Sequence, residues 1–470
     1  MSDEVNYSVS SPNGDYYPQD FSLEDVEITT DFGQKFNIRS MVVELSFFED
    51  LYSFVVSGHV IIKDAVGLIE KFKLDGNEFI RISYGKNKSE NDALKVERTF
   101  RVYKVSNRLP VGNLNAEHFT LHFCTETLLL SEQLKVSKSY TGKKIATDGS
   151  NDGIINNILL EQLNVSRDKL IDIEETYGTY DFIVPRLKPF EAISWLSTYA
   201  RPNKAGSIGA DMLFFETKNG FNYRSLQSMF KEPIYATYRY QAKNIDDAVQ
   251  DFQEKTITVL DYEFVKTYDA LKDINSGTFA NKVITIDPLA RTYKTTEFNY
   301  ADYFDKKKTS SLNSNSVLVP LKNRLGKTQN EASDSRIKLL TTNAAQNQLQ
   351  YVKDIPGSVA KDVGIENYIP LRTAQLGLAN YTVVKITIPG DPGITAGRTI
   401  EFNLLSLKPS TNKKELDRYY SGTYLVSAVR HIITSGGAYQ TVLEICKDSS
   451  PTAYAKINNN SPEFKKAVDE

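Results

Sequence analysis

Two blocks of short runs with alternating apolar and polar positions occur far apart along the chain, and the runs follow in the same order. The runs of the N-terminal block are 54–62, 76–83, 99–105 and 118–124. The runs of the C-terminal block are 381–388, 397–403, 423–429 and 439–446. Alternation with many β-branched and aromatic residues predicts strands. The repeated order therefore predicts two similar β-units in one chain.

Single residues strengthen the correspondence between the blocks. Gly76 and Gly397 each stand at the start of the second run, and Cys124 and Cys446 end the fourth run. These are the only two cysteines in the chain. We expect them to occupy equivalent strand ends in the two units, and we expect neither a disulfide nor a metal site.

The sharpest local motif is Asp75-Gly76-Asn77-Glu78, directly before the strand-like run Phe79–Ser83. Asp, Gly and Asn are the residues that favour tight turns, because they accept left-handed backbone conformations or hydrogen-bond the local backbone. The motif therefore predicts a turn that feeds a strand, and we assign it a structural role.

The segment between the two blocks has the periodicity of helices. Residues 151–163 repeat Ile and Leu at three- and four-residue spacing after Asn and Asp capping residues. Residues 189–200 begin with proline and place apolar residues on one helical face. Residues 64–72 also have apolar residues on one helical face. Asn219-Gly220 between two apolar runs predicts a β-hairpin. Strands are expected to resume at 257–260 and 282–286.

These patterns predict a mainly β, α+β protein made of several parts. They are an arm (1–20), a first β-unit (21–138), a middle α+β domain (139–253), a second β-unit (254–298 and 368–447), a polar insertion (299–367) and a tail (448–470).

Composition narrows the class of function. The net charge of −3 provides no overall attraction for nucleic acid or anionic lipid. No apolar run approaches the roughly 20 residues of a membrane helix, so we expect a soluble protein. Two cysteines provide no disulfide framework, which fits folding in a reducing cytoplasm.

The motifs of common enzymes and metal sites are missing. Gly326-Lys327-Thr328 resembles the end of a phosphate-binding loop, but Leu321 stands where that loop needs glycine. His118 and His122 would lie about 13 Å apart on a strand, which is too far for one metal ion. The sequence predicts no catalytic, metal or cofactor site, although it leaves open a hydrolase built on two carboxylates.

Three segments resemble the central baseplate hub protein of T-even-like contractile-tailed bacteriophages. Residues 74–83 are similar to a strand of that family's first tube domain, and residues 395–402 to a strand of its second. Residues 424–445 resemble its closing strand–turn–strand. The similarity follows the same order from about Phe21 to Lys447.

The resemblance implies that both β-units are barrel-like tube domains and that three subunits form a ring of six barrels. Such a homotrimer would adapt a hexameric tail tube, with its tube-initiator proteins, to a trimeric spike. Tape-measure and baseplate wedge proteins are further implied partners, and DNA would pass through the lumen without specific binding. The family has no enzymatic activity and no cofactor, and it belongs to the tail baseplate of a virion assembled in the host cytoplasm.

Departures and alternatives stay open on the sequence alone. Residues 299–367 and both termini are longer than in the family pattern, so partner contacts do not carry over to them. Related alternatives are the hub of a type VI secretion system or of a tailocin; no repetitive segment follows Cys446, which favours a separate spike. A tail-associated cell-wall hydrolase, a glycan-binding protein and a chance β-rich similarity are the others. We also expect an acidic lumen that repels DNA.

Overall fold

The structure of the protein is a computed structural model. It describes residues 21–30, 33–72, 74–86, 96–112, 116–148, 152–204, 209–240, 258–287, 291–300, 311–317, 337–341, 365–406, 416–435 and 437–452. The predicted arm lies outside the described residues, as do much of the polar insertion and most of the tail.

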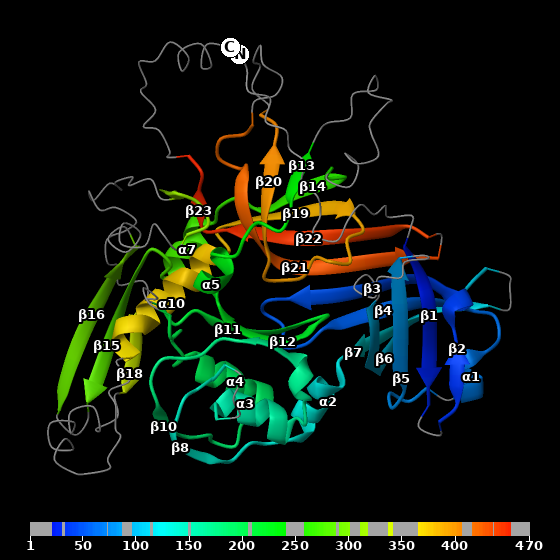
Figure 1. Ribbon diagram of the computed structural model, residues 1–470, viewed down its shortest axis with the longest axis horizontal. Coiled ribbons are helices and arrows are strands. Elements are labelled where there is room, and N and C mark those ends of the chain that lie inside the picture. Colours follow the sequence, from blue (N-terminus) through cyan, green and yellow to red (C-terminus); the bar gives the residue numbers. More distant parts are fainter. Residues whose placement is uncertain are drawn as a thin grey trace.

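Within the described residues, thirteen strands form one sheet that runs through both predicted β-units (Figure 1). Seven come first along the chain: β1 (Phe21–Thr29), β2 (Lys35–Asn37), β3 (Val42–Asp50), β4 (Ser57–Asp64), β5 (Phe79–Lys86), β6 (Val96–Pro110) and β7 (Glu117–Cys124). The others are β13 (Thr237–Tyr240), β14 (Asp261–Lys266), β19 (Thr382–Pro389), β20 (Thr399–Leu404), β21 (Gly422–Thr434) and β22 (Tyr439–Lys447). Each of the eight predicted runs overlaps one of these strands.

The two β-units repeat one strand order. In the first unit the neighbours are β3-β4-β7-β6-β5, and in the second they are β14-β19-β22-β21-β20. Every one of these neighbouring pairs is antiparallel. The repeated sequence pattern therefore corresponds to a repeated topology of five strands.

The repeat extends to an irregularity in one strand. The pairing of β6 with β7 shifts between Val102 and Lys104, and the pairing of β21 with β22 shifts between Val426 and Ala428. Each shift inserts one extra residue, a β-bulge, at the same place relative to the terminal cysteine of the partner strand. The bulges therefore fix a residue-by-residue equivalence between the units.

The expectation of two barrels is not met, because the described strands form no closed barrel. Strand β21 pairs with β20 through residues 422–425 and with β3 through residues 428–434. The second half of β21 thus joins the two units edge to edge, and the sheet stays open within one chain. Sequence patterns indicate which face of a strand is buried but not which distant strand it pairs with.

The hydrophobic core continues across this junction. The first unit is filled by residues such as Val60, Leu121 and Phe123, all fully buried. Ile433 of β21 and Tyr439 of β22 belong to the same cluster. This junction between β21 and β3, called the seam below, is therefore packed by side chains as well as joined by backbone hydrogen bonds.

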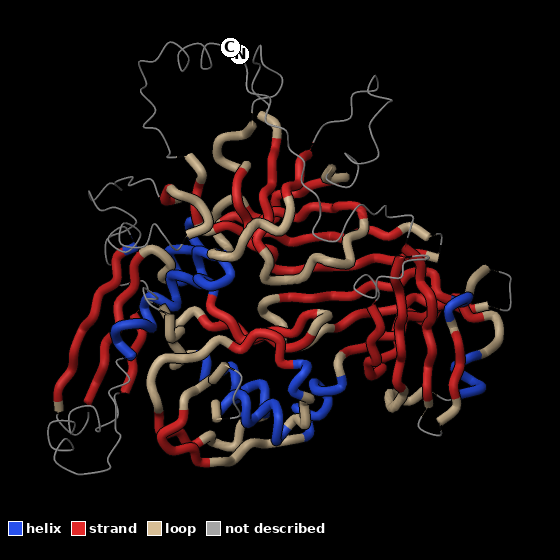
Figure 2. Tube along the Cα trace, in the orientation of Figure 1, coloured by secondary structure: helices blue, strands red, loops and turns tan. Residues whose placement is uncertain are grey.

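The middle domain lies below the sheet in the view of Figures 1 and 2. Its predicted helices and hairpin are present, although the first helix continues as a π-helix. Helix α2 (Glu126–Gln133) precedes this domain. The elements of the domain are β8 (Ser139–Lys143), α3 (Ile154–Asn157), the π-helix Ile158–Gln162, a 3-10 helix (Arg167–Lys169), β9 (Leu170–Ile173), β10 (Tyr180–Ile183), α4 (Pro189–Ser197), β11 (Met212–Thr217), β12 (Gly220–Ser225) and α5 (Leu226–Phe230).

A smaller three-stranded sheet stands apart at the left of Figure 1, covered by a helix. It consists of β16 (Thr292–Asn299), β15 (Ala280–Asp287) and β18 (Ile337–Thr341), and the helix is α10 (Ile365–Ala379). The remaining elements are a 3-10 helix (Arg39–Met41), α1 (Leu68–Phe72), α7 (Ala270–Ser276), β17 (Asn315–Ser316) and β23 (Ser449–Ser450). Among the described helices, none is long and apolar enough to cross a membrane.

Two local predictions need correction. The strand expected at 257–260 begins instead at Asp261, because residues 261–266 carry the alternating pattern that pairs with β19. Helix α10 was missed, since Pro370 lies inside it and the sequence suggested polar loop up to about residue 367.

We predict that His431 makes the seam sensitive to acid. Its ring is buried on β21, with Nδ1 3.0 Å from the Tyr439 hydroxyl, and burial together with the positive charge of Lys218 lowers its pKa to about 3. An unfolded histidine titrates near pH 6.5. Between these values the unfolded state binds a proton that the folded state does not, so stability falls as the pH falls below 6.5, by up to about 1.4 kcal/mol per pH unit.

Urea unfolding at pH 7 and pH 5 tests this. His431→Gln should lose less stability than the unsubstituted protein over that interval. His118→Gln, on the half-buried end of β7, is the matched control and should keep the full loss. Equal losses in His431→Gln and the unsubstituted protein would contradict the prediction.

Candidate assembly surface

The face of the sheet turned away from the core carries polar and aromatic side chains that cross the seam. Arg430 of β21 donates a 3.0 Å hydrogen bond to Glu44 of β3, and its guanidinium lies 5.5 Å from the centre of the Phe48 ring. On β4, His59 packs 5.5 Å from Phe48 and 6.0 Å from His122. These contacts join four adjacent strands, β21, β3, β4 and β7, and both β-units on the open side.

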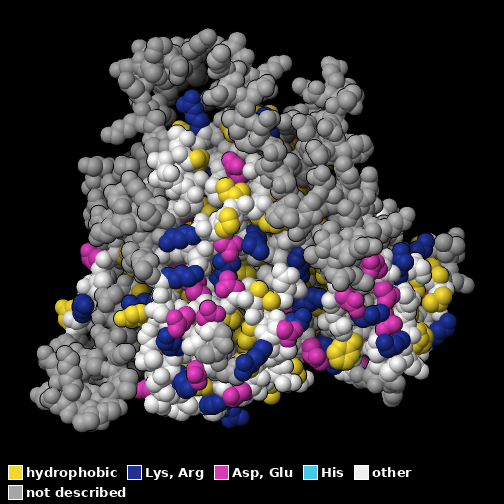
Figure 3. Space-filling view, in the orientation of Figure 1, with side chains coloured by type: hydrophobic (Ala, Val, Ile, Leu, Met, Phe, Trp, Pro, Cys, Tyr) yellow, Lys and Arg dark blue, Asp and Glu magenta, His cyan; other side chains and the backbone are white. Residues whose placement is uncertain are grey.

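Charges of both signs alternate on this open face. Lys385 lies opposite Glu263 on one neighbouring strand and opposite Glu444 on the other. At the other end of the sheet, Arg81 lies 2.7 Å from Asp25 and 3.0 Å from Glu97. The side of the molecule drawn in Figure 3 likewise shows basic and acidic groups interspersed. The described residues of the open face therefore form no continuous acidic wall.

The Asp75–Glu78 motif forms a closed turn at the start of β5. Glu78 is buried, and its two carboxylate oxygens accept hydrogen bonds from the backbone amides of Asp75 (2.8 Å) and Gly76 (3.0 Å). Gly76 has a φ of +96°, a conformation that favours glycine. The carbonyl of Glu78 accepts from the Val102 amide at 3.0 Å. The turn therefore holds β5 against β6 beside the bulge.

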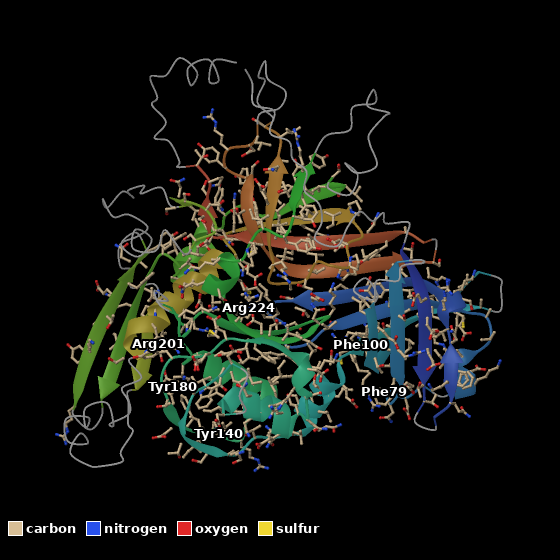
Figure 4. The ribbon with its side chains drawn as sticks, in the orientation of Figure 1. Phe79, Phe100, Tyr140, Tyr180, Arg201 and Arg224 are labelled. Atoms are coloured by element: carbon tan, nitrogen blue, oxygen red, sulfur yellow. The ribbon has the colours of Figure 1, made fainter. Side chains whose placement is uncertain are left out.

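A side-chain clamp covers the same turn. Arg101 Nη1 donates to the Asn77 carbonyl at 2.9 Å, and the Arg101 guanidinium lies 4.2 Å from the centre of the Phe79 ring (Phe79 is labelled in Figure 4). Both contacts keep the motif in a structural role.

Gly397 lies at the corresponding place in the second unit. Its φ is +87°, and its amide donates to the Val426 carbonyl at 2.9 Å. A Cβ atom there would come within 3.2 Å of Met229 and Phe215. The strand pairing aligns Gly397 with Asn77, so the two glycines are offset by one residue between the units.

Cys124 and Cys446 are buried free thiols at equivalent strand ends. Cys124 lies opposite Arg101 of β6, and Cys446 lies opposite Leu425 of β21. Burial, with a smaller contribution from Glu216, raises the pKa of Cys124 to about 11, so its reactive thiolate form is suppressed. Four strand spacings separate β7 from β22, about 19 Å, which no disulfide spans.

A buried carboxylate that sequence reasoning missed ties the middle domain to the first unit. Glu216, at the end of β11, pairs with Arg98 of β6 and accepts from the Val56 amide (2.9 Å) and the Thr125 hydroxyl (2.6 Å). These partners lie far apart in the sequence, so no local spacing could have indicated the cluster.

A second buried carboxylate holds the hairpin against both units. Glu49 of β3 accepts from the Lys218 amide at 2.6 Å and from the Ala396 amide at 3.1 Å. Burial raises the pKa of Glu49, against the opposing effects of Lys218 and these amide hydrogen bonds. The Glu49 side chain thus joins the tip of the β11–β12 hairpin to the segment just before β20, beside the seam.

The described residues contain no group of three or more His, Cys, Asp or Glu side chains arranged to hold a metal ion. His122 Nε2 instead lies 2.7 Å from the Ser106 hydroxyl, in a polar contact between β7 and β6.

Two strand edges are unpaired in the described structure. Strand β6 pairs with β5 only through residues 96–101, which leaves the outer edge of residues 103–110 without a neighbour; we call this the β6 edge. Strand β14, residues 261–266, has β19 as its neighbour on one side only; we call its other side the β14 edge. Exposed apolar side chains lie along both edges.

Comparisons with known proteins fit this architecture. No family model matches the chain. A probable baseplate hub protein of Vibrio phage KVP40 is 21% identical over 420 residues, covering 88% of this chain and 91% of that protein. The chain resembles the baseplate hub proteins of T4-like phages. The resemblance inferred from the sequence is thereby confirmed.

Two tail proteins are among the solved structures that are similar to this chain. The 43 kDa tail protein of prophage MuSo2 from Shewanella oneidensis has a TM-score of 0.50 at 6% identity, covering 90% of this chain and 98% of that one. A tail protein from Neisseria meningitidis MC58 has a TM-score of 0.49 at 10% identity, covering 92% and 99%.

We predict that Glu78→Gln destabilises the protein by about 1–2 kcal/mol, because an amide replaces a carboxylate that accepts from two backbone amides. Asp75→Asn is the control, since Asp75 is exposed and accepts one longer bond of 3.3 Å from the Asn77 amide. Urea unfolding should show the larger loss for Glu78→Gln. Equal losses in the two variants would contradict a special role for Glu78.

Proposed function

We propose that this chain is a structural subunit of the central hub of a phage tail baseplate, in which three copies form a ring of six similar β-units. The observation that carries the proposal is the repeated five-strand order within one continuous sheet. The baseplate hub relative and the tail-protein fold support it independently.

Three copies of a chain with two similar β-units place six similar β-units around the ring. The parts of the chain that are not repeated occur only three times. A ring of this kind can meet a six-fold partner with its repeated units and a three-fold partner with its unrepeated parts. The hub would therefore connect a hexameric tail tube, through its initiator proteins, to a trimeric spike. Tape-measure and wedge proteins are further proposed partners, in a tail baseplate assembled in the host cytoplasm.

The same ring would act as a conduit for DNA. Mixed charges on the open face neither attract phosphates strongly nor repel them, which suits passage without specific binding. The acidic lumen expected from the sequence stays a prediction, and on the open face basic groups stand beside the acidic ones.

The junction within the chain fits a subunit that transmits force. Backbone pairing of β21 with β3, a shared core and the buried carboxylates Glu49 and Glu216 all join the two units and the middle domain. A conduit that transmits force between tube and spike requires units that do not rotate against each other.

Light scattering of the purified protein, alone and with the spike and tube proteins of the same phage, tests the proposal. We expect a species of three times the 53.0 kDa chain mass, alone or once the spike is added. A chain that stays monomeric with every partner at tens of micromolar would overturn the proposed function.

A further inference from the structure

The bulges make β6 and β21 equivalent residue by residue, yet among the described strands only β21 has a partner along its second half. Lys104 corresponds to Ala428, and Val105 to Val429, because each pair faces equivalent residues of β7 and β22. From Ala428 onward β21 pairs with β3. The matching part of β6, from Lys104 onward, is the unpaired β6 edge.

The strand equivalent to β3 also has a free side. Strand β14 stands beside β19 as β3 stands beside β4, so Ser46 corresponds to Glu263 and Phe48 to Lys266. The side of β3 that receives β21 corresponds to the β14 edge. The chain thus contains one completed junction and both halves of a second one.

The two halves cannot meet within one chain. Seven strand spacings lie between β14 and β6 along the sheet, about 34 Å. The described residues of the chain supply no partner for either edge, and the completed junction indicates what such a partner looks like.

The register of β21 on β3 carries over to the two free edges without interruption. Arg430 lies opposite Phe48 and Ile432 opposite Ser46, which places Ser106 opposite Lys266 and Leu109 opposite Glu263. Between these positions β6 has one residue more than β21, at its second bulge, and β14 has one residue more than β3. The two insertions face each other, so neither strand has to slip.

Side-chain chemistry on the two edges is complementary. Leu109 is 62% exposed on one edge and Val265 is 56% exposed on the other. In this register Val265 lies opposite Asn107, one diagonal position from Leu109, so the two exposed apolar side chains come close across the contact.

Proline sets the end of the pairing. Pro110 has no amide hydrogen to donate, and it follows Leu109 at the end of β6. The pairing is therefore expected to run from Lys104 to Leu109 on the β6 edge.

We propose that the β6 edge of one subunit pairs in antiparallel register with the β14 edge of a second copy of this chain, with Leu109 opposite Glu263. The pairing rests on the proposed trimeric hub and specifies its contact. It is a head-to-tail contact between unlike edges, so each subunit uses both of its edges. Three copies then close the ring of the proposed trimeric hub. The sheet then continues around the ring through alternating β21–β3 and β6–β14 junctions.

Disulfide trapping of the full chain tests the register. The double variant Leu109→Cys with Glu263→Cys places two thiols opposite each other on neighbouring copies and too far apart within one copy. Mild oxidation should give covalent dimers and trimers on a denaturing gel. The control is Leu109→Cys with Lys385→Cys, since Lys385 is exposed one strand further from the edge, and its cross-linked yield should be roughly tenfold lower.

A second measurement uses the unsubstituted protein and does not depend on the variants folding. Hydrogen exchange should be slower at residues 104–109 and 261–266 in the trimer than in the monomer at low concentration. A trimer by light scattering without cross-links and without this protection would overturn the strand pairing while the hub function stands. A chain that never trimerises would overturn both, and cross-links running past three copies would contradict the closed ring.

Discussion

Most of this structure depends on the pairing of one long strand with two partners. The first half of β21 completes the second β-unit by pairing with β20, and its second half pairs with β3 of the first unit. A slip of one residue at this junction would turn every buried side chain of the strand to the open face, so the hydrophobic core fixes the register. Two units that could have been separate domains are therefore held as one sheet.

The side chains around the junction oppose motion of the two β-units relative to each other. Core residues of β21 and β22 belong to the cluster of the first unit, and Arg430 bonds across the seam on the open face. Buried carboxylates are costly unless each oxygen has a partner. Glu49 meets that condition by accepting from amides before β20 and at the hairpin tip, which ties the middle domain to the same junction.

The sequence predicted the local elements well and the long-range pairing poorly. The eight alternating runs, the Asn219-Gly220 hairpin and the equivalence of Cys124 with Cys446 were accessible because they depend on residues close together in the chain. The seam was not, since contacting residues such as Arg430 and Ser46 are 384 positions apart. Closed barrels were expected from the family resemblance, and nothing local shows that half of β21 pairs outside its own unit. Glu216 and Glu49 were missed because their partners also lie far away in the sequence.

The account makes one central claim: that the two β-units of each chain occupy alternating, equivalent positions in a closed ring. Electron cryo-microscopy of the protein bound to its spike measures this most directly. The account predicts three chains whose six β-units lie around one channel in near six-fold symmetry, joined by strand pairing at all six junctions. A complex in which the units of neighbouring chains are separate, or in which the two units of one chain lie at different radii from the channel axis, would contradict it.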